Sequence, residues 1–162
     1  MQDIIVPPLN KDAAEIVHKN WLAVNEVPYQ LGKVEKMVEK YAAICGTPDF
    51  EGKIKSAMLL MCGDHGIAKY GVSAYPQEVT MQMINGYMRG TAGANVMARH
   101  AGADVFVVDM GTTFDLSHLP KVRNEKVAWG TEDFTKGPAM TRGQAEMALE
   151  RGMKAVSYTH LT

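Results

Sequence analysis

Two short apolar runs along the chain predict strands that are buried on both faces. The first is Ala57–Cys62, six apolar residues in a row, and the second is residues 104–109, which contain three valines and a phenylalanine. Runs of this length without regular alternation are typical of strands in a parallel sheet that is covered on both sides. We therefore predict parallel strands near residues 56–62 and 104–109.

Apolar residues at helical spacing precede and follow the first of these strands. One helix is predicted after Asn10, which suits an N-cap position, and a second over about residues 31–45, where Gly46 supplies a left-handed stop. A third helix is predicted to open at residues 76–78, and a fourth to span about residues 94–100. The chain between the two strands is therefore predicted to be helical.

The order strand, helices, strand is a βαβ unit, whose crossover is almost always right-handed and makes the two strands parallel. We therefore predict an α/β fold with a parallel-sheet, Rossmann-like three-layer core that follows two N-terminal helices. Both strands then end at the same edge of the sheet, which is where ligands bind in such folds.

The pattern weakens after the second strand. Residues 114–138 predict irregular structure, and we interpret a small basic cluster within them as a solvated loop: Lys121, Arg123 and Lys126. Residues 141–144 have the spacing of a capping box and predict the start of another helix. No third strand is predicted after it. Because a parallel sheet of two strands is not stable alone, we expect the chain to be the front part of a longer protein.

Charge and composition narrow the class of protein. The formal net charge is −1, which gives no basic surface for nucleic acid or an acidic membrane. No apolar run approaches the roughly 20 residues needed to cross a bilayer, and no signal peptide is evident. Cys45 and Cys62 lack the spacing of metal ligands, and we interpret them as buried, reduced thiols. The expected compartment is therefore the cytoplasm.

Polar residues between glycines follow the first predicted strand. Gly63-Asp64-His65-Gly66 comes directly after the apolar run, and Asp109 ends the second strand. An acid and an imidazole at the carboxyl edge of a parallel sheet are candidates for binding or catalysis. A structural interpretation stays open beside this one, because Asp64 can cap the turn and His65 can tie two loops together.

Two other classes of function also stay open. A metal-dependent hydrolase would take its ligands from neighbouring strand ends, namely Asp64, His65, Asp109 and His118. The sequence shows no paired histidine spacing that predicts a metal site. A non-catalytic binding protein would keep the pocket without the chemistry.

A long motif gives the chain a family resemblance. Gly63–Gly66 followed by Gly71–Thr80, which reads GVSAYPQEVT, resembles nicotinate-nucleotide:dimethylbenzimidazole phosphoribosyltransferases. Further segments that carry the resemblance are Leu31–Glu35, Gly93–Val96, Val107–Gly111, Gly130–Thr131 and Pro138–Thr141. The family usually has a glycine-serine turn before Leu31, where this chain has Pro28-Tyr29-Gln30.

The resemblance implies a transferase: a glycosyltransferase of the pentosyltransferase class. It would move phosphoribose from nicotinate mononucleotide to dimethylbenzimidazole, giving α-ribazole phosphate and nicotinate for assembly of the cobalamin nucleotide loop. No pyrophosphate leaves, so no metal or other cofactor is expected. The resemblance also implies a full-length protein that is roughly twice as long as this chain and forms a homodimer.

The resemblance also implies roles for particular residues. The general-base glutamate is expected outside these 162 residues, so no catalytic residue is assigned here and the chain alone is expected to be inactive. The substrate-binding residues are expected to be Asp64, His65, Ser73, Ala74, Tyr75 and Gln82.

These patterns divide the chain into three parts. Residues 1–50 are predicted to form an N-terminal arm and helices, and residues 51–156 the first part of the phosphoribosyltransferase domain. Residues 157–162 form a tail that does not resemble the family, as an artefact of cloning or sequencing would.

Overall fold

The chain divides into two compact units, residues 2–54 and 55–162. The turn at residues 28–30, where the sequence departs from the family pattern, lies outside the described part of the chain. The residues that the computed structural model describes are 6–24, 31–49 and 55–158.

The N-terminal unit contains two helices that pack on each other. α1 spans Lys11–Val24 and α2 spans Lys33–Cys45. α1 begins as predicted, because Asn10 Oδ1 accepts the N–H of Ala13 at 3.1 Å. α2 ends as predicted at Gly46, whose φ of +73° is a left-handed conformation that glycine adopts without strain. The small core between the helices consists of Ala13, Val17 and Ala42 with Trp21 and Val38 packed against them.

The larger unit is built on a parallel sheet. β1 spans Ser56–Gly63, β2 spans Ala103–Gly111 and β3 spans Val122–Asn124. The strand order is β1-β2-β3, and both neighbouring pairs are parallel. The two parallel strands predicted from the apolar runs are therefore confirmed.

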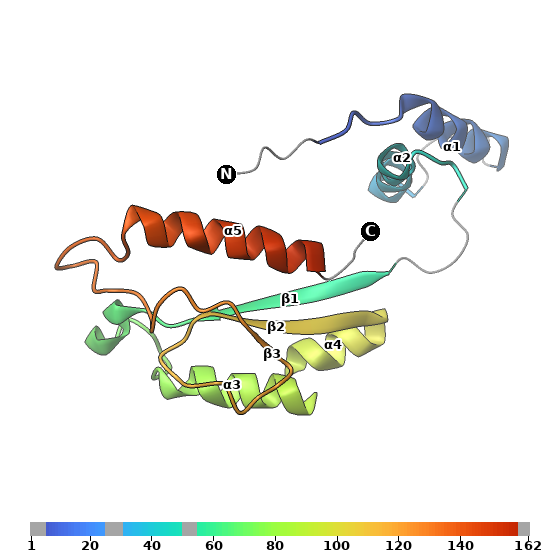
Figure 1. Ribbon diagram of the computed structural model, residues 1–162. Coiled ribbons are helices and arrows are strands. Elements are labelled where there is room, and N and C mark those ends of the chain that lie inside the picture. Colours follow the sequence, from blue (N-terminus) through green and yellow to red (C-terminus); the bar gives the residue numbers. More distant parts are fainter. Residues whose placement is uncertain (1–5, 25–30, 50–54, 159–162) are drawn as a thin grey trace. The chain divides into compact units, whose positions relative to one another are not determined.

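Helices cover both faces of this sheet (Figure 1). α3, which spans Glu78–Arg89, and α4, which spans Gly93–Ala101, lie on one face. α5, which spans Arg142–Tyr158, lies on the other face. A short 3-10 helix, η1, spans Gly66–Tyr70 directly after β1. The predicted three-layer α/β fold is confirmed.

The third strand was not predicted, since residues 114–138 were interpreted as irregular throughout. β3 is three residues long, and Val122 is its single buried residue. So short a segment shows no hydrophobic period. It becomes a strand because the open edge of β2 offers hydrogen-bond partners, which pair Val107 with Val122 and Asp109 with Asn124.

The three basic residues that were interpreted as a solvated loop are not all solvated. Arg123 lies in β3 and its Nε is 2.8 Å from Glu125 Oε1. The side chain of Lys126 is only 11% exposed and pairs with Asp109. Lys121 alone has the exposure expected of a solvated loop. The partner of Arg123 is two residues away in sequence. The partner of Lys126 lies in β2 and is brought to it by the tertiary structure, so sequence spacing could not indicate it.

The core of the larger unit lies between the sheet and α3. Ile84 of α3 is completely buried, and it packs with Val107, Leu116 and Val122. Removal of apolar surface from water stabilises such a cluster by roughly 25 cal/mol per Å². α3 is thereby fixed across the strands, with its first turn close to the end of β1.

α5 begins with the predicted capping box. The N–H of Gln144 donates to Thr141 Oγ1 at 3.2 Å, and the N–H of Thr141 donates to Gln144 Oε1 at 2.8 Å. Further along the helix, Arg151 donates to the carbonyl oxygen of Lys126. The contact of Arg151 anchors α5 to the segment that follows β3.

The cysteines depart from the prediction of buried thiols. Both are free, but Cys45 is exposed and Cys62 is half-buried. Cys45 is the last residue of α2 and lies beyond the buried pair Ala42 and Ala43, so nothing in the small helical core covers it. Within the described ranges, no helix is both long and apolar enough to cross a membrane.

Candidate functional site

The loops after β1 and β2 meet at one edge of the sheet, as predicted. Gly63 pairs with Gly111, and the N–H of Asp64 donates to the carbonyl oxygen of Gly111 at 2.9 Å. The glycine-flanked segment after β1 therefore lies beside the loop formed by residues 111–114.

Asp64 is buried at this edge, with 4% exposure. Its Oδ1 accepts the hydroxyl of Thr80 at 2.7 Å. Its Oδ2 accepts both the N–H and the hydroxyl of Thr113, at 2.8 and 3.0 Å. The carboxylate thus joins the end of β1 to the first turn of α3 and to the loop after β2.

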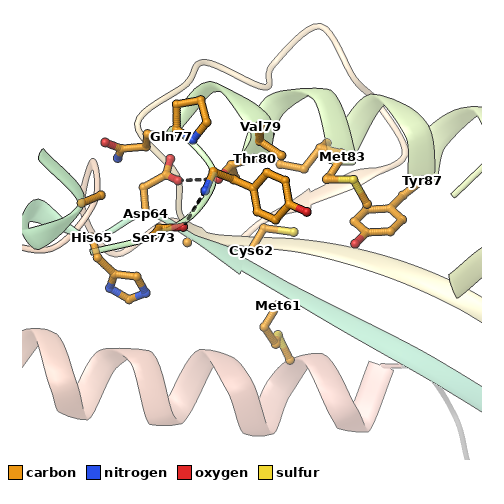
Figure 2. Close-up of a pocket in the computed structure, with 15 residues that line it drawn as sticks. Met61, Cys62, Asp64, His65, Ser73, Gln77, Val79, Thr80, Met83 and Tyr87 are labelled. Atoms are coloured by element: carbon orange, nitrogen blue, oxygen red, sulfur yellow. Dashed lines mark hydrogen bonds between the residues drawn. The ribbon is translucent and has the colours of Figure 1, made fainter. Parts of the chain in front are cut away.

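His65 lies on the other side of the same segment. Its backbone forms an isolated parallel bridge with Thr131, and the N–H of Thr131 donates to the carbonyl oxygen of Asp64 at 3.0 Å. The exposed imidazole has its Nδ1 3.5 Å from Thr131 Oγ1. Figure 2 shows this ring pointing away from α3.

Gly66 permits a close approach of two backbones. A Cβ on this residue would lie 2.7 Å from the carbonyl oxygen of Thr131 and from the carbonyl carbon of Glu132, and 2.8 Å from the nitrogen of Asp133. The N–H of Gly66 donates to the carbonyl oxygen of Thr131 at 3.0 Å. Only glycine lets residues 130–133 run this close to the segment after β1.

Asp133 ties η1 to the same segment. The hydroxyl of Tyr70 donates to its Oδ2 at 2.9 Å, and Lys69 Nζ lies 2.9 Å from the same oxygen. Thr135 donates to Oδ1 through its N–H and its hydroxyl. The hydrogen bonds from Thr135, with those from Lys69 and Tyr70, hold the pKa of Asp133 well below its ordinary value.

A pocket of about 360 Å³ lies between the end of β1, the loop after η1 and α3. Its inner wall is apolar, with Cys62, Ile84 and Tyr87, and Figure 2 shows Met61 on the opposite side of β1 from Cys62. Asp64, Ser73, Gln77 and Thr80 contribute its polar groups, and His65 also lines it, although its ring points away from α3. Such a mixture of apolar surface and few polar groups is typical of a site for a small molecule.

Burial and the nearby carboxylates shape the chemistry of this pocket. Desolvation, and then the negative charges of Asp109 and Asp64, raise the pKa of Cys62 to about 11. The thiol is therefore protonated at neutral pH and acts as an apolar wall rather than as a nucleophile.

Four of the six predicted substrate-binding residues line this pocket: Asp64, His65, Ser73 and Tyr75. Ala74 and Gln82 are not among the residues that line it, and both are exposed. The face of α3 toward the pocket follows the helical steps Thr80, Met83, Ile84 and Tyr87. Gln82 is two residues from Thr80 and so falls on another face. The roles of Ala74 and Gln82 stay predictions from the resemblance.

Thr80 was missed by sequence reasoning, although it lines the pocket and binds Asp64. Its place in the i, i+3, i+4, i+7 series with Met83, Ile84 and Tyr87 is a signal that the sequence does contain. The second partner of Asp64, Thr113, is 49 residues away in sequence, and no spacing rule identifies it.

The metal-dependent hydrolase is not favoured by this geometry. Both oxygens of Asp64 already accept hydrogen bonds, and Asp109 Oδ1 accepts the N–H groups of Gly111 and Thr112 at 3.1 and 2.8 Å. Asp109 Oδ2 lies 3.1 Å from Lys126 Nζ. Within the described residues, no three His, Cys, Asp or Glu side chains are grouped to hold a metal ion.

The sheet is parallel, is covered by helices on both faces and has a pocket at the carboxyl end of its strands. This arrangement is typical of α/β proteins that bind small ligands at this edge of the sheet. A family model described as phosphoribosyltransferase matches residues 6–161, and the chain belongs to this family. Residues 157–162 were predicted to form a tail that does not resemble the family, and the match includes all of them except Thr162.

Several relatives of the chain carry the same name. A nicotinate-nucleotide–dimethylbenzimidazole phosphoribosyltransferase from Geobacter metallireducens is 46% identical over 124 residues, which are 76% of this chain and 35% of the relative. One from Chloroflexus aggregans is 40% identical over 148 residues, which are 91% of this chain and 42% of the relative. The crystal structure of CobT from Thermus thermophilus superposes with a TM-score of 0.82 at 35% identity, covering 91% of this chain and 43% of that one. The chain thus spans less than half the length of these relatives.

Proposed function

We propose that the protein transfers the phosphoribosyl group of nicotinate mononucleotide to dimethylbenzimidazole, giving α-ribazole phosphate and nicotinate for the cobalamin nucleotide loop. The names of the relatives and the family of the chain support this activity. The observation that carries it is the pocket beside α3, whose apolar inner wall suits a flat aromatic base.

The chemistry assigns different tasks to this chain and to the rest of the protein. The bond between the anomeric carbon and the pyridinium nitrogen breaks, and nicotinate leaves with the bonding pair. A benzimidazole nitrogen forms the new bond to the same carbon, and a carboxylate takes the proton from the other ring nitrogen. That carboxylate is proposed to be a glutamate outside these 162 residues.

The described residues are proposed to bind and orient the base. Ser73 and Tyr75 line the open side of the pocket, and Met83 and Tyr87 line the apolar side. Asp64 already uses both carboxylate oxygens to hold Thr80 and Thr113, so its proposed role is to set the shape of the pocket. No step in this scheme requires a metal or another cofactor.

The setting of the protein is proposed on the same basis. The relatives act on small molecules by name, and a net charge of −1 offers no basic surface for nucleic acid. We therefore propose a cytoplasmic enzyme with small-molecule substrates, which works as a homodimer and does not bind membranes.

Binding of the base is the first test. Met83 lines the pocket but is 41% exposed, so Met83→Glu places a charge against the base without disturbing the core. We expect at least about tenfold weaker binding of dimethylbenzimidazole in calorimetric titration, because an apolar base cannot compensate a desolvated carboxylate. The matched control is Met97→Glu on α4, at a methionine that is 68% exposed. Equal affinities in the two methionine variants would place the base elsewhere. Gln82→Leu is expected to weaken binding of the base, and unchanged affinity in this variant would remove Gln82 from the site.

Turnover is the second test. The 162 residues would be assayed alone, and also joined to the part of Thermus CobT that follows the aligned region, with nicotinate mononucleotide and dimethylbenzimidazole. We expect α-ribazole phosphate, detected by chromatography, from the fusion and none from the chain alone. Product from the chain alone would contradict a general base outside it. A folded fusion that binds both substrates and forms no product would contradict the function.

A further inference from the structure

A largely buried lysine lies beneath the loop that supports the pocket. The side chain of Lys126 is 11% exposed, and its Nζ is 3.1 Å from Oδ2 of Asp109, whose side chain is 1% exposed. Nζ also donates to the carbonyl oxygens of Thr112 and Phe114, the latter at 2.8 Å. The ring of Trp129 covers the ammonium group, with its centroid 4.0 Å away.

This environment compensates the charge of a largely buried ammonium group. Desolvation of an ammonium is costly unless an opposite charge and hydrogen bonds compensate it, and the group has three N–H donors to place. Asp109 compensates the charge, while Thr112 and Phe114 accept its hydrogen bonds. An interaction of this kind fixes the backbone to which the lysine is bound.

Asp109 and Lys126 hold the same loop, Asp109 through backbone N–H groups and Lys126 through backbone carbonyl groups. Asp109 Oδ1 accepts the N–H groups of Gly111 and Thr112, and Lys126 donates to the carbonyl groups of Thr112 and Phe114. Thr113, in the middle of the loop, is left to donate its N–H and hydroxyl to Asp64. Asp64 in turn accepts the hydroxyl of Thr80, in the first turn of α3, which forms the pocket wall.

We propose that Lys126 is a positioning residue for the pocket. It holds residues 111–114 so that Thr113 orients Asp64 and, through Asp64, the first turn of α3. Lys126 does not line the pocket, so its effect on a ligand passes through Thr113. The ligand that reports this effect, dimethylbenzimidazole, rests on the proposed function, whereas the arrangement itself can be measured without a ligand.

The first experiment replaces the ammonium and keeps most of its volume. In Lys126→Met, amide hydrogen exchange at Thr113 is expected to be about tenfold faster, while exchange at Val107 in β2 stays as in the wild type. Affinity for dimethylbenzimidazole is expected to fall by about the same factor, since it depends on the same loop. The control is Lys121→Met, which removes a lysine that is exposed. Wild-type exchange at Thr113 in a folded Lys126→Met protein would overturn the proposal.

A second variant tests the path through Thr113 and does not depend on the survival of the first. Thr113 is exposed, so Thr113→Val is expected to fold, and it removes the hydroxyl that binds Asp64. It should weaken binding of the base, and Lys126→Met should add little to it in the double variant, because both changes act on one contact. Additive losses in the double variant, or wild-type affinity in Thr113→Val, would overturn the proposal.

The two proposals can fail separately. A wild-type protein that does not bind dimethylbenzimidazole contradicts the proposed function. In that case the Thr113 amide still decides the positioning role, since its exchange is measured in the ligand-free protein. The conservative Lys126→Arg variant provides a further check. It keeps the charge beside Asp109 but changes the geometry of the N–H donors. Relative to Lys126→Met, it should therefore recover more of the folding stability than of the exchange protection at Thr113.

Discussion

Asp64 shows how a site can depend on a side chain whose own polar atoms are already used. Its two oxygens hold Thr80 and Thr113, and its backbone pairs with Gly111 and Thr131. The sequence left open whether this acid caps a turn or meets a ligand. The observed contacts give it the structural role and still place it in the pocket wall.

Gly66 is the residue at which we expect the smallest change to have the largest effect. In Gly66→Ala the new methyl group meets backbone atoms of residues 131–133 at 2.7–2.8 Å, and backbone atoms cannot turn aside as a side chain can. We expect a loss of about 1–3 kcal/mol in the free energy of unfolding, measured by urea denaturation. The control is Gly63→Ala in β1, where the nearest atom to the new methyl group is Gly111 O at 3.8 Å. Equal stability of the two variants would show that residues 131–133 can move away at little cost.

Cys62 gives a prediction about reactivity. Its pKa of about 11 means that the thiol is protonated at neutral pH, and only the thiolate attacks an alkylating reagent. In Cys45→Ser, where Cys62 is the remaining cysteine, we expect slow labelling by iodoacetamide at pH 7 that accelerates as the pH rises toward 11. Cys62→Ser, which keeps the exposed Cys45, should label quickly at pH 7. Rapid labelling of Cys62 at pH 7 would show that the native protein opens this pocket to solvent.

At the scale of elements, the site is held together by loops that cross between strands. η1 is bound to the segment after residue 130 through Asp133, and the loop after β2 is bound to the continuation of β3 through Lys126. α3 then closes the pocket because Ile84 anchors it on the sheet. Polar contacts therefore order both loops, and the loop after β2 is also held by Leu116, which packs in the core with Ile84.

The link between η1 and Asp133 predicts sensitivity to acid. A carboxylate whose pKa is lower in the folded than in the unfolded state stabilises the fold above its unfolded pKa, which is about 3.9 for aspartate. That contribution is lost as the pH falls below this value toward the folded pKa. We expect the stability difference between wild type and Asp133→Asn to be large at pH 7 and to shrink between about pH 4 and 2, measured by urea denaturation. In the control Glu150→Gln, at an exposed position on α5, no such trend is expected, and a constant difference for Asp133→Asn would contradict the assignment.

At the scale of the whole molecule, the described chain forms two compact units with different amounts of core. The larger unit contains a sheet covered on both faces, whereas the helical unit has only a small cluster around Ala13, Val17 and Ala42. Several large apolar side chains of the helical unit are exposed, including Ile16, Met37 and Ile44. Surface of this kind is typical of a region that packs against another chain.

Association is therefore predicted to depend on these helices. An isologous dimer that buries the exposed apolar residues of α1 and α2 would be weakened by Met37→Glu, at a position that is 66% exposed. We expect light scattering to show a dimer for the full-length wild type and a monomer for this variant at full length. The control is Leu149→Glu on α5, which is 59% exposed in the larger unit and should remain dimeric. A wild-type protein that is monomeric at micromolar concentration would contradict the predicted dimer.

Local patterns were enough for much of the fold. The apolar runs predicted β1 and β2, the caps at Asn10 and Thr141 predicted where α1 and α5 begin, and the βαβ order predicted the parallel pair. These features depend on residues close together in sequence, whose spacing expresses backbone geometry directly. The motif after β1 also placed Asp64, His65, Ser73 and Tyr75 at the pocket.

Only the tertiary structure decided the contacts between residues that are distant in sequence. β3 exists because the edge of β2 was free, and Lys126 is buried because Asp109 and the loop at residues 112–114 surround it. The pairing of Asp64 with Thr113 spans 49 residues, and a hydrogen bond of that kind depends on where two loops meet rather than on any local preference. The sequence by itself determined the longer helices, the strands β1 and β2, and the family. The fold decided which polar side chains are held rigid around the pocket, because a charge or a hydroxyl acquires its partner only when the chain is packed.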